Sequence, residues 1–519
     1  MLILPSRSKF IEDAKAGRLS PVYTELPFIP PHEVYETLPR DFGTYSFLLE
    51  SAKGPEKIAR YSFVGAEPFL IFKVKDGIVE IEVSPELASG QGSALSQVQA
   101  RGQKINNVKA PLKKLRKILG AYKVEAPPFL PPFIGGVVGL LSYDFVHYFE
   151  QLPRTTIDDL KIPNAHFLFV DTVVAFDHKE KRTYIISCPG ATEIVQGSIV
   201  QGFNPQSNWG EYYDASCEKI NELYKKMGSR SERPSEKTYF FEKPIEVRHE
   251  MSKSDYMDIV KRAKEYIKAG DIFQANLSQR VSADIGDVTP WQIYLILREI
   301  NPSPFSAYLD MEDYHIVSSS PERLLRVQRG IVETRPIAGT RPRGKDARCD
   351  SEMRIELLMN EKERAEHIML IDLERNDLGR VSDYGSVFVD EFMITEEYSH
   401  VIHIVSNIRG TLTDGRDCLD AIRSAFPGGT ITGVPKVRCM EIIDELEPVA
   451  RGPYTGSLGY ISFTGAMDLN IIIRTFVIKD NIAYVQVGAG IVADSDPERE
   501  YYETLKKAEA LIRTLERLR

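Results

Sequence analysis

The chain has 519 residues, a formal net charge of −9 at pH 7, 43% hydrophobic residues and 27% charged residues. This length exceeds that of one simple core, so we expect two packed units, and the negative charge argues against a nucleic-acid partner. The first residues, MLILPSRSKF, lack a basic region followed by a long apolar segment, so we expect no signal peptide. The most apolar segment, 133–142, is about half as long as a membrane span. Five scattered cysteines form no disulfide framework or zinc motif. We therefore expect a cytoplasmic protein without membrane contacts.

Residues 1–235 show a mixture of strand and helix patterns. The Gly- and Ser-rich segment 84–103 predicts a loop, and 228–237 (GSRSERPSEK) predicts a linker. The elements expected before the linker are strands at 45–49, 60–64, 69–74, 78–83, 166–176 and 183–187 and a helix at 111–122. We therefore divide the chain into residues 1–235 and 236–519.

The second part has longer and more regular patterns. The elements expected there are helices at 252–268, 360–380 and from 496 onward and strands at 389–394, 401–408, 471–478 and 483–487. Gly270 follows the first of these helices and is a typical residue for its end.

The segment 360–380 (NEKERAEHIMLIDLERNDLGR) consists of good helix formers as far as Gly379. Glu363 and Glu366 are three residues apart, so they share a helix face, which continues through Leu370 and Leu373. Carboxylates in line with buried leucines need a positive partner, such as a hard cation or a cationic side chain. The alternative is that this is an ordinary Glu-rich helix with a solvated face.

The last helix has a second pair of carboxylates. Asp496 is a typical N-cap before Pro497, and Glu500 and Glu503 are again three residues apart. Two such faces from distant parts of one chain suit Mg²⁺, which takes few carboxylates and leaves positions for water and an anionic ligand. The alternative is a surface ion pair between Glu503 and Lys507, four residues later.

Two glycine-rich segments resemble nucleotide motifs but do not match them. Gly488-Ala489-Gly490 follows a strand, but only one helix comes after it, so no βαβ unit can form. The segment 428–436 (GGTITGVPK) has Val-Pro before its Lys and no Ser or Thr after it, which argues against a P-loop. Both segments can still bring backbone N–H groups close to a small anion such as a carboxylate.

Three polar residues lie in or beside apolar runs. Arg474, within IIIRTF, needs an anion from the protein or from a ligand. His403 alternates with apolar residues and is either a core histidine or a functional one. Glu322 follows SSSP and is either an acid at a strand end or part of a turn.

Taken together, these segments resemble the anthranilate synthase and aminodeoxychorismate synthase component I family of chorismate-utilising enzymes. The matching motifs occur in the family's order: LLES (48–51), RYSFVGAEP (60–68), SPE (320–322), RPIAGTRPRG (335–344), EKERAEHIMLIDLERNDLGR (361–380), FPGGTITGVPKVR (426–438), GSLGY (456–460), IIIRT (471–475) and GAGIVADSDPEREYYET (488–504). The resemblance implies an α+β fold, with antiparallel sheets packed in a sandwich and helices outside. Residues 1–235 would form the regulatory N-terminal region and 236–519 the chorismate-binding catalytic domain.

The resemblance also implies a role for each matched residue. Glu322 would be the general acid, aided by Thr340, and His403 would serve the elimination of pyruvate. Glu366 and Glu503 would bind Mg²⁺, supported by Glu363 and Glu500. The residues implied for chorismate binding are Gly429, Thr430, Tyr454, Arg474, Gly488, Ala489, Gly490 and Lys507. Those implied for a tryptophan pocket are Ser51, Asn301, Pro302, Ser303, Pro304 and Phe305.

The product depends on Ala338, where the aminodeoxychorismate branch commonly carries a lysine that attacks C2. The absence of this lysine leaves C2 of chorismate open to ammonia and favours anthranilate as the product. In contrast, FQANLSQR (273–280) and NPSPFSAYL (301–309) look more like the aminodeoxychorismate branch. Isochorismate and salicylate synthases fit less well. A non-catalytic homologue would be expected to lose Glu322, His403, Glu366 or Glu503, and all four are present.

No cysteine lies on a Gly-flanked turn of the kind a glutaminase nucleophile needs. A separate glutamine amidotransferase subunit is therefore expected to supply ammonia within a hetero-oligomer, with L-tryptophan as a candidate inhibitor.

Overall fold

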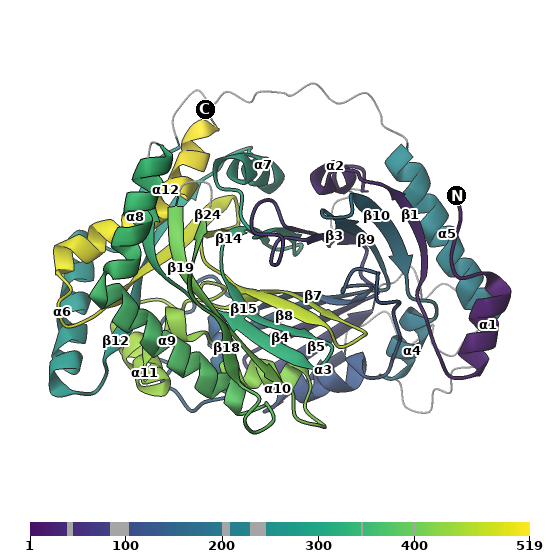
Figure 1. The fold of residues 1–519 in the computed structure, drawn as a ribbon, viewed down its shortest axis with the longest axis horizontal. Helices are drawn as coiled ribbons and strands as arrows, with labels where there is room; N and C mark the ends of the chain where they lie inside the picture. The colour runs from purple at the N-terminus through teal and green to yellow at the C-terminus, as the bar shows by residue number, and fades with distance from the viewer. Residues whose placement is uncertain are drawn as a thin grey trace.

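The computed structural model describes residues 1–38, 45–83, 103–199, 208–228, 245–343, 346–397 and 401–518. In these ranges two large antiparallel sheets pack against each other and helices lie around them (Figure 1). The predicted α+β fold, with antiparallel sheets in a sandwich and helices outside, is confirmed. No helix in the described ranges combines the length and apolarity needed to cross a membrane.

The first sheet combines strands from both halves of the chain. In order across the sheet these are β1 (Val22–Pro27), β10 (Arg182–Ser187), β9 (Thr172–Asp177), β3 (Tyr61–Ala66), β2 (Ser46–Glu50), β13 (Phe305–Asp310), β14 (His315–Ser320), β23 (Thr475–Lys479), β24 (Ile482–Ile491), β12 (Gln274–Asp284) and β11 (Val247–His249), with β20 (Gly433–Val434) beside β12.

The second sheet is likewise shared by both halves. Its strands in order are β17 (Ile337–Pro342), β19 (Val401–Thr411), β16 (Ile331–Arg335), β15 (Arg323–Gln328), β22 (Met467–Ile471), β21 (Ser457–Ser462), β7 (Gly136–Leu141), β8 (Ala165–Val170), β4 (Leu70–Lys75), β5 (Ile78–Val83) and β6 (Gln103–Ile105), with β18 (Phe388–Glu397) beside β19. β17 follows β16 along the same edge of β19.

The helices cover the outer faces and the ends of the sandwich. They are α1 (Arg7–Lys15), α2 (Pro31–Tyr35), α3 (Pro111–Leu119), α4 (Ala191–Gly197), α5 (Trp209–Gly228), α6 (Lys253–Ala269), α7 (Pro290–Ile300), α8 (Ala347–Met359), α9 (Glu361–Gly379), α10 (Cys418–Ala425), α11 (Lys436–Leu446) and α12 (Pro497–Arg517), with the 3-10 turns η2 (Tyr143–Tyr148) and η3 (Gly429–Ile431). In Figure 1, α1 and α5 lie at one end of the molecule, and α6, α8 and α12 at the other.

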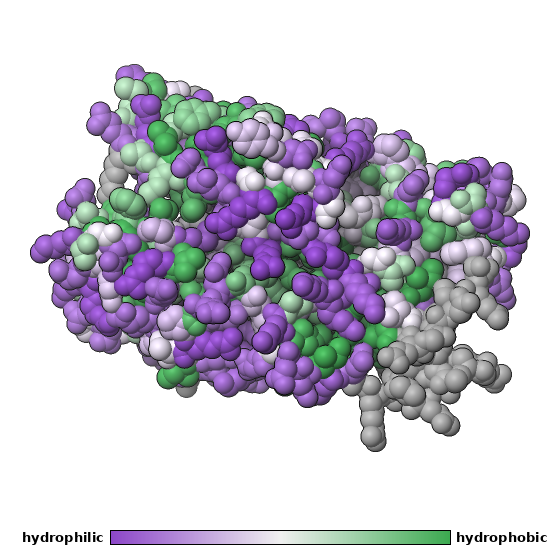
Figure 2. All heavy atoms as spheres, turned by 90° about the horizontal axis from the view of Figure 1, so that it is seen from below, coloured by the Kyte–Doolittle hydropathy of each residue, from purple (hydrophilic) through white to green (hydrophobic). Residues whose placement is uncertain are grey.

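Apolar side chains form three main cores. The first fills the space between the two sheets. The second lies between the first sheet and α1, α2, α5, α7 and α12, and the third lies under α6, α11 and α12. The face seen in Figure 2 is mostly hydrophilic, and its hydrophobic side chains gather in small separate groups. The facing sides of the sheets and the inner sides of these helices are therefore covered within the chain.

The three long helices predicted in the second part are confirmed, and each begins with a side-chain cap. Ser252, Asn360 and Asp496 accept hydrogen bonds from the backbone N–H groups of Asp255, Glu363 and Arg499. Gly270 ends α6 in the left-handed conformation, with φ +84°. These caps satisfy donors that the first turn of a helix leaves unpaired.

Two strand predictions are wrong in the same way. The run 166–176 is two strands, β8 in the second sheet and β9 in the first, and the run 471–478 is β22 in the second sheet and β23 in the first. Both runs stay apolar because the chain passes through the common core as it changes sheets. Hydrophobicity alone therefore does not mark the break.

The predicted division between residues 235 and 236 falls within 229–244, outside the described residues, as do most of the predicted linker and the predicted loop except for Gln103. Strands from both sides of this division join both sheets. The two parts of the sequence therefore do not each have a sheet of their own.

Candidate active site

Glu322 and Arg474 lie where the chain passes between the sheets. Glu322 stands between β14 and β15, and Arg474 stands between β22 and β23. The two crossings run side by side, because Ile471 N–H donates to the Glu322 carbonyl at 3.0 Å and Ser319 N–H donates to the Arg474 carbonyl at 3.1 Å. The fold thus places an acid and a guanidinium at one corner of the sandwich.

The Glu322 carboxyl is buried, with 6% of the residue exposed, and its Oε1 has no hydrogen-bond partner. Burial raises its pKa to about 7, and the nearby Thr430 hydroxyl, Ile337 amide and Arg474 charge oppose the shift. An acid of this kind retains a proton near neutral pH, as a proton donor in catalysis must.

Arg474 has φ +51°, an unfavourable conformation for a residue with a side chain. Burial lowers its pKa, and the Glu322 charge raises it. No hydrogen bond or ion pair to its guanidinium is present in the part of the chain that the structure describes. A guanidinium placed in this way is suited to bind an anionic ligand.

His403 lies on β19 opposite Thr340 of β17, and 2% of it is exposed. Its Nδ1 donates to the Gly339 carbonyl at 3.3 Å. Burial, together with the Arg474 charge, lowers its pKa to about 3, so the imidazole is neutral and Nε2 carries its lone pair. The buried Ala338 lies between Ile337, whose amide is near Glu322, and Gly339, whose carbonyl accepts from His403.

The backbone conformation of Gly339 favours glycine, because its φ is +67°. A Cβ there would also crowd the carboxylate of Glu363 and the side chain of Leu357. The strand that carries Ala338 can therefore lie directly against α9. The side chain of Thr340 lies outside the described residues.

The glycines of β24 allow polar groups to approach the backbone. A Cβ on Gly488 would meet the Tyr454 hydroxyl at 2.7 Å, and Lys507 Nζ donates to the Gly488 carbonyl at 3.0 Å. Ala489 is buried between Gly488 and Gly490. Gly429 similarly lies against Leu373 of α9, which brings η3 and Thr430 to the same helix.

The predicted metal ligands approach this strand from two helices. Gln274 Nε2 donates to Glu366 Oε1 at 2.9 Å, and a Cβ on Gly490 would meet the same nitrogen at 2.5 Å. On α12, Glu503 pairs with Lys507 at 3.0 Å, which is the contact expected from the alternative to a metal ligand.

These carboxylates suit magnesium by their oxygen donors, but they are not gathered into a cluster. Glu363 is paired with Arg341 at 2.7 Å, and no three His, Cys, Asp or Glu residues converge on one metal position within the described ranges. Glu500, one turn before Glu503, lies close enough to raise the pKa of Tyr256. The oxygen atoms of these carboxylates are nevertheless the type of donor that Mg²⁺ prefers.

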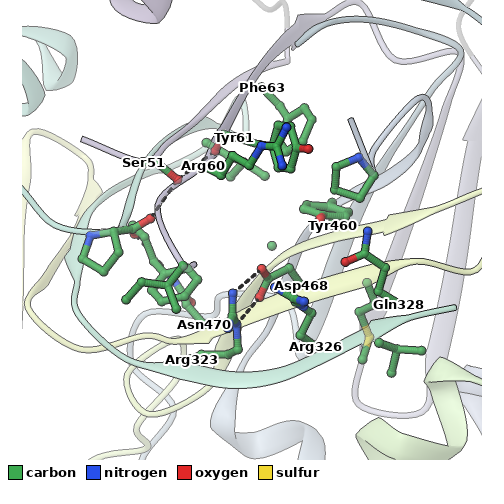
Figure 3. A pocket seen from close by; sticks show the side chains of 18 of the residues that line it. Ser51, Arg60, Tyr61, Phe63, Arg323, Arg326, Gln328, Tyr460, Asp468 and Asn470 are labelled. Atoms are coloured by element: carbon green, nitrogen blue, oxygen red, sulfur yellow. Dashed lines mark hydrogen bonds and ion pairs between the residues drawn. The ribbon is translucent and has the colours of Figure 1, made fainter. Parts of the chain in front are cut away.

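A separate cavity of about 700 Å³ lies between the sheets (Figure 3). Ser51, Pro304 and Phe305 line it, as do Arg323 and Asp468, which form an ion pair at 2.8 Å. Of the other residues predicted for the tryptophan pocket, Asn301 and Ser303 do not line the cavity. They stabilise the turn before β13, because Asn301 Nδ2 donates to Ser319 Oγ and Ser303 N–H donates to Ser306 Oγ. Pro302, between them, does not line the cavity either.

Sequence reasoning missed two buried residues of the site. Gln274, in the motif FQANLSQR, contacts Glu366. Glu374 lies on α9 with 8% of its surface exposed, and its Oε2 accepts a hydrogen bond from Thr334 Oγ1 at 2.6 Å. The sequence offered a signal for Glu374, since it lies about two turns beyond Glu366 and directly after Leu373 in the same helix.

Comparison with known proteins shows the family of the chain. The model of the chorismate binding enzyme family matches residues 47–513, and the chain belongs to this family. It is 42% identical to anthranilate synthase component 1 of Acetivibrio thermocellus, over 91% of this chain and 90% of that protein. It is also 42% identical to aminodeoxychorismate synthase component 1 of Bacillus subtilis (strain 168), over 90% of this chain and 91% of that protein.

Among solved structures, the chain is similar to anthranilate synthase component I from Streptococcus pneumoniae TIGR4. The TM-score is 0.73 at 33% identity, covering 88% of this chain and 92% of that one. The protein is thus a chorismate-utilising enzyme of the anthranilate and aminodeoxychorismate synthase type.

Proposed function

We propose that this chain is an anthranilate synthase component I, which aminates chorismate with ammonia and then eliminates pyruvate, a lyase reaction in tryptophan biosynthesis. The observation that carries the proposal is the arrangement around Ala338. Glu322 is near the amide of Ile337, and His403 donates to the carbonyl of Gly339. A proton donor and a neutral imidazole therefore flank a small side chain that offers no amine.

In the first step, Glu322 donates its proton to the 4-hydroxyl of chorismate as the C4–O bond breaks and water leaves. Hydroxide is a poor leaving group, so this proton is essential. The nitrogen of ammonia attacks C2, the ring double bonds shift, and the new ammonium group loses a proton. The product is aminodeoxyisochorismate.

In the second step, His403 Nε2 accepts the proton from C2. The bond between C3 and the enolpyruvyl oxygen breaks, that group takes up a proton at its methylene carbon, and pyruvate leaves. The ring becomes aromatic, so the overall change is chorismate plus ammonia to anthranilate, pyruvate and water. A neutral His403 is ready to accept the proton.

The two carboxylates of chorismate need positive or N–H-rich partners. Arg474 and Tyr454 would bind the enolpyruvyl carboxylate, with Gly429 and Thr430 beside it, and the Gly488–Gly490 backbone with Lys507 would receive the ring carboxylate. A Mg²⁺ ion held by Glu366 and Glu503, with Glu363 and Glu500 in support, would supply the charge that neutralises the ring carboxylate.

Ammonia would come from a separate glutamine amidotransferase subunit in the cytoplasm. All five cysteines are free, and Cys188, Cys418 and Cys439 are buried. Burial raises the pKa of Cys418 to about 12 and of Cys439 to about 12. Thiols of this kind are poor nucleophiles, which argues against a glutaminase within the chain.

The cavity between the sheets supports regulation by L-tryptophan. It has acidic and basic side chains on its walls and aromatic rings from Phe63, Tyr61 and Tyr460, so it can accept a zwitterion with an aromatic group (Figure 3). Ser51 and Phe305, predicted from separate motifs, both line it.

The second candidate function is aminodeoxychorismate synthase component I, of the transaminase class, which makes 4-amino-4-deoxychorismate for folate biosynthesis. The chain is 42% identical both to an anthranilate synthase component 1 and to an aminodeoxychorismate synthase component 1, and this equal similarity favours the second function as a candidate. Ala338 argues against it, because no lysine is available there to occupy C2.

Product analysis of the purified chain with chorismate, Mg²⁺ and an ammonium salt at raised pH tests the proposal. We expect anthranilate and pyruvate in equal amounts, and no product when glutamine replaces the ammonium salt. Release of 4-amino-4-deoxychorismate without anthranilate would establish the second function, and activity with glutamine alone would show a glutaminase within the chain.

A further inference from the structure

Asn276 is a buried polar residue that has no role in the proposed reaction so far. It lies on β12 with 9% of its surface exposed, and its amide oxygen, Oδ1, has no hydrogen-bond partner in the described ranges. An unpaired buried acceptor destabilises a folded protein, so an atom of this kind in a binding site indicates a ligand that donates to it.

The backbone of Asn276 is held from several sides, which fixes the direction of its side chain. Its N–H donates to the Thr432 carbonyl at 2.9 Å, and its carbonyl accepts from Arg451 Nη2 at 2.6 Å. Across the sheet it pairs with Gly490 of β24. The residues directly before and after it belong to the apolar core under α6, α11 and α12. The side chain of Asn276 therefore points to the opposite face of the strand.

On that face the side chain of Asn276 lies against Gly488 and close to Tyr454. A Cβ on Gly488 would meet Asn276 Oδ1 at 2.5 Å and the Tyr454 hydroxyl at 2.7 Å. The backbone of Gly488 belongs to the proposed site for the ring carboxylate of chorismate, and Tyr454 to the proposed site for the enolpyruvyl carboxylate. Asn276 Oδ1 therefore lies beside both carboxylate sites.

The chorismate atom that separates these two sites is C2. The ring carboxylate is attached to C1 and the enolpyruvyl group to C3, so C2 lies between them. An amide oxygen at this place accepts a hydrogen bond from an N–H group but offers nothing to a carboxylate oxygen. An amide also takes no proton near neutral pH, so ammonia held by it keeps its lone pair for attack.

We propose that Asn276 Oδ1 accepts a hydrogen bond from the attacking ammonia and holds its nitrogen next to C2. This inference rests on the proposed function, and it names a residue that contacts the nucleophile. Asn276 itself forms and breaks no covalent bond. Its contribution is to bind ammonia and to direct the lone pair of the nitrogen toward the ring.

The test measures the binding of ammonia and of chorismate separately. Asn276→Leu keeps the approximate volume of the side chain and removes the acceptor. At saturating chorismate, its KM for free NH₃ should rise about three- to tenfold. Its Kd for chorismate with Mg²⁺, measured by calorimetry without ammonia, should change by less than about twofold. Its melting temperature should not fall, because the variant loses an unpaired buried acceptor.

A second variant and a control complete the set. Asn276→Asp still has an oxygen acceptor, so its KM for free NH₃ should stay within about twofold of the wild-type value. Its negative charge beside both carboxylate sites should weaken chorismate binding instead. Ser282→Ala is the matched control, because Ser282 is another buried polar residue on the same face of β12, and its hydroxyl donates to Glu250. This variant should leave both constants unchanged.

Two results would overturn the inference while the proposed function stands. If Asn276→Leu weakens chorismate binding and leaves the KM for free NH₃ unchanged, the amide binds a carboxylate through Nδ2 rather than ammonia through Oδ1. If Asn276→Asp raises the KM as much as Asn276→Leu does, the acceptor is not what matters. A wild-type chain that does not aminate chorismate would instead reject the proposed function and this inference with it.

Discussion

Burial acts in opposite directions on the two titratable residues of the proposed mechanism. It favours the neutral form of each, so it raises the pKa of Glu322 to about 7 and lowers that of His403 to about 3. The proton of Glu322 is fully present only well below pH 7 and is lost as the pH rises through about 7. One apolar corner therefore holds a proton donor and a proton acceptor at the same time.

Variants of these two residues should separate the two steps. Glu322→Gln cannot donate a proton to the leaving hydroxyl, so both products should disappear, with a rate loss of roughly 10²-fold or more. His403→Met should leave amination intact and accumulate aminodeoxyisochorismate, measured by chromatography. His166→Met, which removes another buried neutral imidazole, should still give anthranilate. Anthranilate formation by His403→Met at the wild-type rate would contradict the assignment.

Ala338 should decide where nitrogen enters. In Ala338→Lys the new amine would compete at C2, so ammonia should be diverted toward C4 and 4-amino-4-deoxychorismate should be detected by chromatography. Ala338→Met adds a similar volume without an amine and serves as the control for crowding. Identical products from both variants would mean that size, rather than chemistry, matters at this position.

The chemistry of single residues could be read from the sequence more fully than their conformations. Arg474 was predicted to need an anion because a guanidinium within IIIRTF has no other reason to be there. Its positive φ and its place at a sheet crossing could not be predicted, because both depend on the pairing of β14 with β23 and of β15 with β22. Glu374 was missed because its partner, Thr334, is distant in sequence.

At the scale of elements, helices were predicted better than strands. α9 and α12 have local start signals, Asn360 and Asp496, and α12 also has a periodic apolar face. Where the chain changes sheets between two strands, the sequence has no such boundary signal, because an apolar run continues through the core on both sides of the break. The break at residues 472–474 was therefore hidden, although it is what places Arg474.

The two helices should bind one metal ion together. Glu366→Gln on α9 or Glu503→Gln on α12 should weaken Mg²⁺ binding by about tenfold or more and remove most activity, while the metal-free protein keeps its melting temperature. Titration calorimetry with Mg²⁺ in the presence of chorismate measures this. The control is Glu509→Gln, which breaks an exposed ion pair with Arg513 on the same helix, α12. Unchanged binding in both variants would place the metal elsewhere.

At the scale of the whole molecule, the cavity and the active site share strands. Arg323 lines the cavity, and the residue before it, Glu322, is the proposed proton donor. This closeness could not be predicted from a division into residues 1–235 and 236–519, because both sheets contain strands from both parts. A ligand between the sheets therefore lies one residue away from the proton donor.

A network of charges provides a second connection. Lys57, on the cavity wall, pairs with Glu391 at 2.8 Å and with Glu396 at 3.2 Å, both on β18. Arg335 pairs with the same two carboxylates at 2.6 and 2.5 Å. Glu396 is the backbone partner of His403 in the sheet. Movement of the segment around Lys57 would therefore reach the strands that carry His403 and Ala338.

Loss of this network should uncouple tryptophan from chorismate. In the wild-type protein, chorismate without ammonia should weaken tryptophan binding by about fivefold or more, since coupling between two sites is reciprocal. Lys57→Met and Glu391→Gln should reduce this factor to less than about twofold while tryptophan alone still binds, as measured by calorimetry.

Glu391 does not line the cavity, so its variant separates coupling from direct contact. Lys179→Met is the control, because it breaks the ion pair at 2.7 Å with Glu56 of the same segment without touching β18. Coupling that survives in Lys57→Met and Glu391→Gln would rule out this route, and absence of tryptophan binding to the wild type would remove the regulatory proposal and favour the aminodeoxychorismate function.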